Sequence, residues 1–311
     1  MNATTLLILL IKISLMTLMV GLGLGLQLDA LKDFRHRPWL ILRVLLGTCV
    51  LVPLAGLLVL QLPFTLQMSP GARFGIALMA LSPSAPLTLR KAHLQGGDRH
   101  LAALLQVAAA LLAIVSIPLL TDVFRAVYQV EGWDIRPRDV ALQVALVQVL
   151  PLTIGLVLRR LFPRFGARWA LPIQKGSFLV TLAVVALVLA TVFPKLLLFF
   201  LGNPLAIPTM VLMTAIALAI GYILGGRKAG ERTTTALVTS MRNPGLALLF
   251  AVTHGGEIAG VKLAILTYLV VTILASIPFL RWWSASGITR DADGAPDRSA
   301  EAPMRPPPPH R

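Results

Sequence analysis

The chain has 311 residues, of which 57% are hydrophobic and 13% are charged, and its mean hydropathy is +0.82. A soluble domain carries about 25% charged residues, so this composition excludes a water-soluble globular protein, and most of the chain must contact lipid. The net charge of +15 comes mostly from basic residues in short connections between apolar runs, where they are typical of membrane topology signals and not of a nucleic-acid-binding surface.

About nine apolar runs, each of roughly 20 residues, follow one another along the chain, and each is predicted to cross the membrane as a helix. They lack the alternation of apolar and polar residues that would indicate a β-barrel. The runs cover residues 6–26, 39–60, 72–94, 99–121, 139–161, 169–193, 203–225, 233–254 and 259–281. The predicted fold is therefore all-α, a polytopic membrane protein with one transmembrane domain over residues 1–282.

The connecting loops differ in their basic residues. The loops after the first, third, fifth and seventh runs contain about twice as many lysines and arginines as the other loops, which predicts that they face the cytoplasm. The N-terminus is then outside and the C-terminus cytoplasmic, in a protein expected in a bacterial inner membrane. Residues 283–311 are polar and include consecutive prolines at 306–309, so they are predicted to form a disordered cytoplasmic tail.

Prolines interrupt the third and eighth runs near their centres. The residues concerned are Pro83 and Pro86 in the third run, and Pro244 and Gly245 in the eighth. A proline inside a helix removes a backbone hydrogen bond, at a cost of about 3 kcal/mol, and freed backbone groups in lipid need partners from protein or water. Both interruptions are therefore predicted to face the interior. Ser82 and Asn243 precede proline as good helix caps, which predicts that a half-helix begins after each.

The two interruptions occupy corresponding places, because one further run follows each interrupted run. The interrupted runs also cross the membrane in opposite directions. This pattern is typical of inverted-repeat transporters, in which two discontinuous helices cross at the substrate site. The repeats are predicted at residues 1–121 and 137–282, and the two interruptions are predicted to contact each other. Ordinary proline kinks are the alternative interpretation.

Three segments resemble the bile acid:sodium symporter family. Residues 18–24, before a basic loop that ends in Arg37 and Pro38, are similar to the family's Met/Phe/Gly-rich helix. Residues 82–98 align with its Cys-Pro-Gly-Gly-Thr-Ala-Ser-Asn segment, and residues 236–247 with its Leu-Glu-x-Gly-x-Gln-Asn-Ser-Gly-Leu-Ala segment. The resemblance extends over about residues 6–281. It implies a secondary transporter of small organic anions, which is not an enzyme.

The chain departs from this family at the positions that the resemblance associates with sodium. The family's glutamate falls on Val238 and its glutamine on Arg242, while its Ser-Asn pair falls on Thr88 and Leu89. Arginine keeps its charge at physiological pH and would repel a sodium ion at the same place. We therefore expect degraded sodium sites, no bound metal and no cofactor.

The candidate substrate-binding residues lie in and near the two interruptions. They are Ser84, Thr88, Arg90, Arg242 and Asn243. An arginine at a helix centre costs from about 3 to more than 10 kcal/mol, so Arg242 is predicted to face a cavity, a partner or an anion, as a fixed counter-ion where the family binds sodium. Arg90 is also compatible with ordinary cytoplasmic positive charge. The acidic residues all lie in loops, at span ends or in the tail, which leaves none at mid-membrane for ion coupling.

Three functions fit these features. The first is a transporter of small organic anions that works by alternating access. The second keeps sodium coupling through backbone and hydroxyl oxygens. The third is a non-transporting membrane sensor or scaffold. The expected partners are an organic anion and the lipid bilayer, with no nucleic acid, and the sequence leaves the substrate and the oligomeric state open.

Overall fold

The computed structural model describes residues 3–26, 37–84, 97–128, 137–254 and 258–285. Regular structure in these ranges is helical, apart from one isolated bridge between Ser84 and Arg242. The all-α prediction is thus confirmed for this part of the chain. Most of the predicted tail, together with Pro86, Thr88, Leu89 and Arg90, lies outside the described residues.

The helices include two π-helical turns (η1 and η3) and one 3-10 turn (η2). Before residue 130 they are α1 (Ala3–Gly25), α3 (Pro38–Leu46), η1 (Gly47–Leu51), α4 (Val52–Val59), η2 (Thr65–Gln67), α5 (Pro70–Leu81) and α7 (Arg99–Tyr128). After it they are α8 (Pro137–Val144), η3 (Ala145–Val149), α9 (Leu150–Leu161), α10 (Pro163–Gly202), α11 (Ala206–Leu224), α12 (Ala229–Ser240), α13 (Pro244–His254) and α14 (Val261–Ala285).

Six helical stretches are long and apolar enough to cross a membrane, by length and composition. They are Pro38–Val59, His100–Val127, Pro137–Leu161, Pro163–Leu187, Ala206–Leu224 and Val261–Trp282. Each falls on a predicted run. Three shorter apolar helices, Leu9–Gly25, Pro70–Leu81 and Pro244–Thr253, fall on the remaining three runs. That these also contribute to membrane spans, and that the chain contains inverted repeats, stay predictions.

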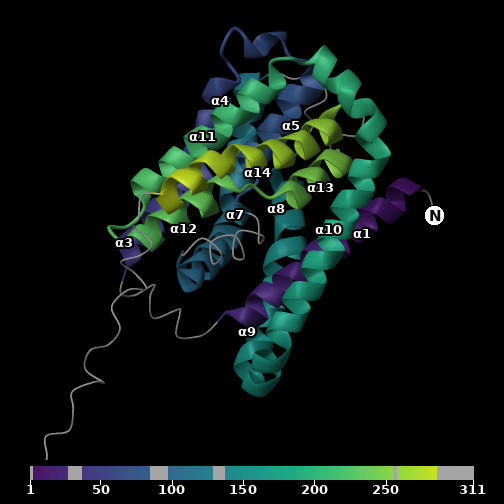
Figure 1. Ribbon diagram of the computed structural model, residues 1–311. Helices are drawn as coiled ribbons and strands as arrows, with labels where there is room; N and C mark the ends of the chain where they lie inside the picture. The colour runs from purple at the N-terminus through teal and green to yellow at the C-terminus, as the bar shows by residue number, and fades with distance from the viewer. Residues whose placement is uncertain (1–2, 27–36, 85–96, 129–136, 255–257, 286–311) are drawn as a thin grey trace, which may run out of the picture.

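The helices pack in two groups. In the first group α1 packs against α9 and α10, and Figure 1 shows these three helices together. Gly23 and Gly155 allow the close approach of α1 and α9, because a Cβ atom at Gly155 would lie 2.3 Å from the Val20 carbonyl oxygen. The second group contains α3, α4, α5, α7 and α11 to α14, and it holds most of the largest apolar core, including Phe74 and Phe250. α8 packs against α7 and continues through η3 into α9, so it links the two groups.

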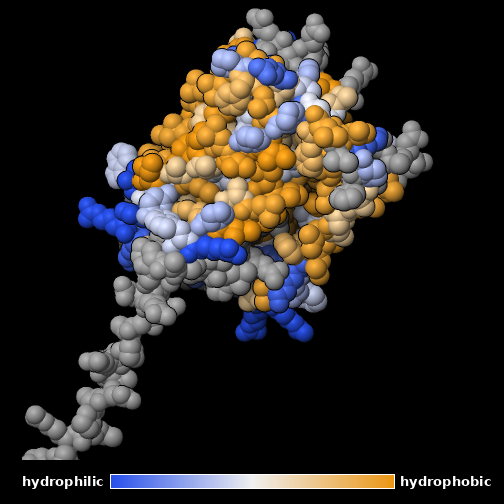
Figure 2. Space-filling model, turned by 45° about the horizontal axis from the view of Figure 1, so that its top comes forward, coloured by the Kyte–Doolittle hydropathy of each residue, from blue (hydrophilic) through white to orange (hydrophobic). Residues whose placement is uncertain are grey.

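The outer surface is strongly apolar. Large hydrophobic side chains such as Leu58, Leu119 and Ile223 are exposed, and Figure 2 shows a broad apolar face with hydrophilic residues toward its margins. Such a surface needs a nonpolar solvent, because an exposed apolar area of this extent does not occur on soluble monomers. The protein is therefore an integral membrane protein.

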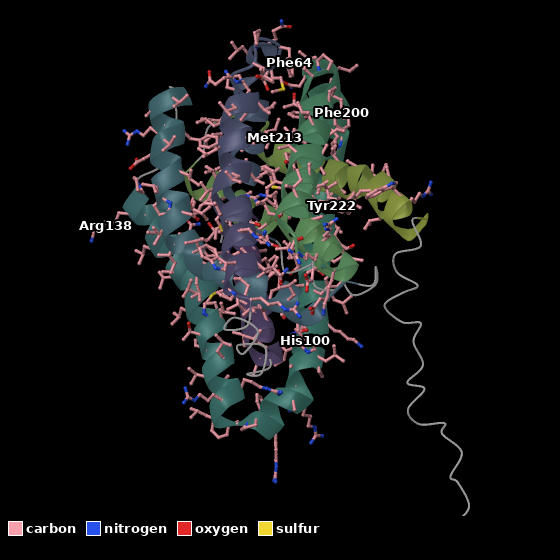
Figure 3. All side chains as sticks on the ribbon, turned by 90° about the vertical axis from the view of Figure 1, so that its left-hand side faces the viewer. Phe64, His100, Arg138, Phe200, Met213 and Tyr222 are labelled. Atoms are coloured by element: carbon pink, nitrogen blue, oxygen red, sulfur yellow. The ribbon has the colours of Figure 1, made fainter. Side chains whose placement is uncertain are left out.

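Three labelled residues mark the two ends of the helix bundle. Phe64, after the second run, and Phe200, near the end of α10, lie toward one end of the helices in Figure 3. His100, at the start of α7, lies toward the other end. Which of the two ends faces the cytoplasm stays a prediction from the loop charges.

Candidate functional site

The eighth predicted run is broken between α12 and α13. Asn243 caps the second half-helix, because its Oδ1 accepts a hydrogen bond from the Leu246 backbone N–H at 3.1 Å. Pro244 occupies the first helical position, where its missing N–H has no helical partner to lose. The predicted half-helix start at Asn243 and Pro244 is confirmed.

The third run is broken differently from the prediction. α5 ends at Leu81, and the Ser82 hydroxyl donates to the Leu78 carbonyl oxygen at 2.7 Å. Ser82 therefore closes the helix before it, and Pro83 itself is not helical, whereas the continuation of this run after Ser84 lies outside the described residues. Pro83 is thus not the first residue of a helix, because the Ser82 hydroxyl bonds back to the preceding turn, and that a half-helix begins after this break stays a prediction.

The two breaks contact each other. Ser84 and Arg242 form an antiparallel bridge, and the Asn243 N–H donates to the Ser82 carbonyl oxygen at 3.4 Å. Extended segments leave backbone groups without helical partners, and each break supplies such partners to the other. The predicted contact between the breaks is confirmed, and it brings Ser84, Arg242 and Asn243 together. All three side chains are buried.

Arg242 is only 2% exposed, and its guanidinium group donates to four backbone carbonyl oxygens. Nε bonds to Met79 at 3.1 Å, Nη1 bonds to Thr48 at 2.9 Å and to Thr239 at 3.4 Å, and Nη2 bonds to Ala80. A guanidinium has five N–H donors, so one is left after these bonds. The group is held by backbone oxygens in the way that a bound cation would be.

The acceptors of Arg242 are carbonyls that helix geometry leaves available. Two come from the last turn of α5, where acceptors outnumber helical donors and the helix dipole is negative. The third belongs to Thr48 in η1, where the Val52 N–H bonds to the Gly47 carbonyl. The π-helical partner of the Thr48 carbonyl would be the N–H of residue 53, which is a proline. Pro53 thus frees the oxygen that Arg242 uses.

The position that the family resemblance assigns to a glutamate is apolar. Val238 is buried in a hydrophobic cluster that includes Leu101, Leu105 and Leu237. The hydroxyls of Thr48, in η1, and Thr239, in α12, lie 3.0 Å apart. Over the described ranges no group of three or more His, Cys, Asp or Glu residues could hold a metal ion. The oxygens near the breaks are therefore hydroxyls, amides and backbone carbonyls.

The acidic residues near α12 are engaged in structural contacts that the sequence did not reveal. Glu231, in the first turn of α12, is 7% exposed and pairs with Arg37 before α3. Asp98 caps α7 by accepting from the Leu101 N–H at 3.0 Å, and its own N–H donates to the Thr234 hydroxyl at 2.8 Å. The sequence signal that could have identified Glu231 as a structural residue is its place in the first turn of a helix, where the helix dipole stabilises a carboxylate.

The first helix group reaches the second break. A Cβ atom at Gly245 would lie 2.7 Å from Cδ2 of Leu15, so glycine allows α1 to pass against the first turn of α13. The start of α13 therefore lies where the two helix groups meet.

Comparisons with known proteins agree with this architecture. The sodium bile acid symporter family model matches residues 12–198, which is more than half of the chain. The chain is also 25% identical over 262 residues to a Bacillus subtilis (strain 168) protein described as "Uncharacterized sodium-dependent transporter YocS", with 82% of this chain and 77% of that protein covered.

Proposed function

The chain belongs to the sodium bile acid symporter family, and from this premise we propose that it is a secondary active transporter of small organic anions. The observation that carries the proposal is the contact between the two breaks, in which Ser84 pairs with Arg242 and Asn243 bonds to Ser82. In transporters built from inverted repeats, two discontinuous helices meet at the substrate site, and the contact between the breaks supports that arrangement here. The proposed repeats are residues 1–121 and 137–282, and rocking of one helix group against the other would alternate access.

An anionic substrate suits the charges at this place. The N-terminus of α13 presents the positive end of a helix dipole, and the buried charge of Arg242 lies next to it in sequence and structure. The Asn243 amide uses Oδ1 to cap α13, which leaves its Nδ2 as a donor for a carboxylate oxygen. Arg242 would act on the anion mainly through its field, because carbonyl oxygens already take most of its donors.

We further propose that anion binding needs no sodium. Arg242 puts a permanent cation beside the breaks, and Val238 offers no carboxylate to compensate a second one. The second candidate function is a sodium-coupled symporter that uses hydroxyl and backbone oxygens. The Thr48 and Thr239 hydroxyl pair and the sodium dependence in the name of the Bacillus subtilis relative favour that candidate.

A thermal-shift screen of the purified protein against organic anions separates these candidates, because a ligand that binds the folded state raises its apparent stability. Each anion is tested in sodium chloride and in choline chloride at equal ionic strength. We expect equal stabilisation in the two salts. A tenfold higher affinity in sodium, about 1.4 kcal/mol, would favour the sodium-coupled candidate.

Two variants sharpen the screen. Arg242→Gln should weaken anion binding in both salts, because it removes the fixed charge and supplies no carboxylate for sodium. The double variant Val238→Glu with Arg242→Gln rebuilds part of the family pattern. Anions should stabilise it more in sodium chloride than in choline chloride, whereas they should stabilise the parent equally in the two salts. No stabilisation by any anion would instead favour a sensor or scaffold.

A further inference from the structure

The connection between α9 and α10 forms a tight helical hairpin. α9 ends at Leu161 and α10 begins at Pro163, and we call residues 159–175 the α9–α10 tip. Two candidate membrane spans, Pro137–Leu161 and Pro163–Leu187, are joined here, so the tip lies near a membrane surface. Figures 1 and 3 show it at the end of the first helix group, farther from the centre of the molecule than His100 at the start of α7.

The α9–α10 tip is strongly basic. Arg159 is used by the hairpin itself, because its Nη1 donates to the Pro163 carbonyl oxygen at 3.4 Å. Gly166 leaves room for this side chain, since a Cβ atom there would lie 2.6 Å from Cδ of Arg159. The remaining basic side chains of the tip are exposed, and they are Arg160, Arg164, Arg168 and Lys175. No acidic residue occurs in the sequence from 140 to 230, so α9 and α10 do not balance these charges themselves.

Large apolar side chains lie among the cations. Those that are 45% exposed or more are Leu161, Phe162, Phe165 and Trp169. The ring centroids of Phe165 and Trp169 lie 6.3 Å apart, and Arg164 and Arg168 repeat at the same one-turn spacing on the adjacent face of α10. Rings of this kind favour the boundary between lipid headgroups and acyl chains, while arginine side chains beside them reach the phosphate level. The tip therefore matches the headgroup region in both charge and apolarity.

We propose that the α9–α10 tip binds the headgroups of anionic phospholipids. A guanidinium group matches phosphate oxygens with two parallel N–H bonds. A zwitterionic headgroup carries its own cation beside the phosphate, so a cluster of basic side chains favours a lipid with net negative charge. A topology signal needs charge alone, whereas this surface pairs exposed cations with exposed rings at the same helical spacing. The inference does not depend on the proposed function.

The test measures lipid binding to the purified full chain in a neutral detergent by native mass spectrometry. The probes are dioleoyl phosphatidylglycerol and dioleoyl phosphatidylcholine, which differ in the headgroup and share their acyl chains. The double variant Arg164→Gln with Arg168→Gln removes two cations of the tip. The matched control, Arg227→Gln with Lys228→Gln, removes two exposed cations between α11 and α12. A further titration adds inorganic phosphate at the concentration of the lipid.

We expect the parent to bind phosphatidylglycerol at least about tenfold more tightly than phosphatidylcholine. The tip variant should lose about 25-fold in phosphatidylglycerol affinity, because each arginine contributes about fivefold near an anionic headgroup, and the control should lose less than about twofold. Trp169→Ala should weaken the binding of both lipids, since the ring contacts the region that they share.

Equal affinity for the two lipids would overturn the proposal, and so would equal losses in the two double variants. Displacement of phosphatidylglycerol by inorganic phosphate would assign the tip to a free anion in place of a lipid. An unchanged affinity for both lipids in Trp169→Ala would reduce the surface to an ordinary topology signal.

Discussion

The hydrogen bonds of Arg242 predict a graded loss of stability when its donors are removed. Arg242→Met keeps much of the side-chain volume but has no donor, whereas Arg242→Gln keeps an amide with two N–H groups. A buried acceptor that loses its partner costs at least about 1 kcal/mol. The carbonyls of Thr48, Ala80 and Thr239 lose this partner, whereas the Met79 carbonyl also accepts from the Ser82 N–H at 3.2 Å. Three lost acceptors correspond to a destabilisation of about 3 kcal/mol in the Met variant. The Gln variant should lose about half of that.

An opposing contribution acts on the same variants. A guanidinium out of water carries a desolvation cost, and some buried ionic groups can be replaced by apolar residues with no loss of stability. Here the acceptors are carbonyls of two helix ends and of η1, which no apolar side chain can satisfy. We therefore expect the lost hydrogen bonds to outweigh the relief of desolvation, and the order of stability to be parent, then Gln, then Met.

The single cysteine gives a convenient assay. Cys49 is buried next to Thr48 in η1, so its reaction with a thiol-reactive dye on heating reports the opening of this region. Arg43→Met, at an exposed position of α3, should change the unfolding transition by less than about 0.5 kcal/mol. A Met variant that is as stable as the parent, or more stable than the Gln variant, would refute the view that these carbonyls depend on the guanidinium.

Three further predictions follow from other contacts. Gly155→Ala should destabilise the protein by about 1–3 kcal/mol in thermal unfolding, because its Cβ would meet backbone atoms of α1, whereas Gly176→Ala, with nothing within 4 Å of its Cβ, should not. Asn243→Ala should lower the free energy of unfolding by about 1 kcal/mol, because the α13 cap is lost. Asn243→Asp keeps an acceptor oxygen and should retain most of that stability. Equal losses of stability in the two variants would contradict the capping role. In a Cys49→Ala background, the pair Ser84→Cys and Asn243→Cys should crosslink and shift the reduced band on a gel, while either cysteine alone should not.

The sequence predicted those features of the site that depend on local residue types. Asn243 followed by Pro244 identified a half-helix start because capping and proline geometry involve only neighbouring residues. Ser82 followed by Pro83 has the same pattern, but Pro83 is not the first residue of a helix. The Ser82 hydroxyl can bond in either direction, and here it bonds to the Leu78 carbonyl oxygen while Ser82 and Ser84 pair through their backbone with Asn243 and Arg242, contacts that no local pattern reveals.

The partners of Arg242 could not be predicted in the same way. That a buried arginine needs partners follows from the cost of its charge, but backbone carbonyls carry no residue identity that a sequence pattern can reveal. The Thr48 oxygen becomes available only because η1 is π-helical and Pro53 has no N–H. The pairing of Glu231 with Arg37 joins residues far apart in the chain, and it was missed because both residues look like ordinary loop charges.

The composition of α12 has a consequence for the way the chain enters the membrane during synthesis. Its buried side chains are mainly hydroxyls, which are Thr233, Thr234, Thr235, Thr239 and Ser240. Such a helix gains little from lipid by itself, but it packs along α11, so the two can insert together as a helical hairpin. Arg242 emerges directly afterwards, when the carbonyls of η1 and α5 have already been synthesised. The order of the segments thus allows the nascent protein to offer this arginine its acceptors as it leaves water, without exposing the charge to lipid.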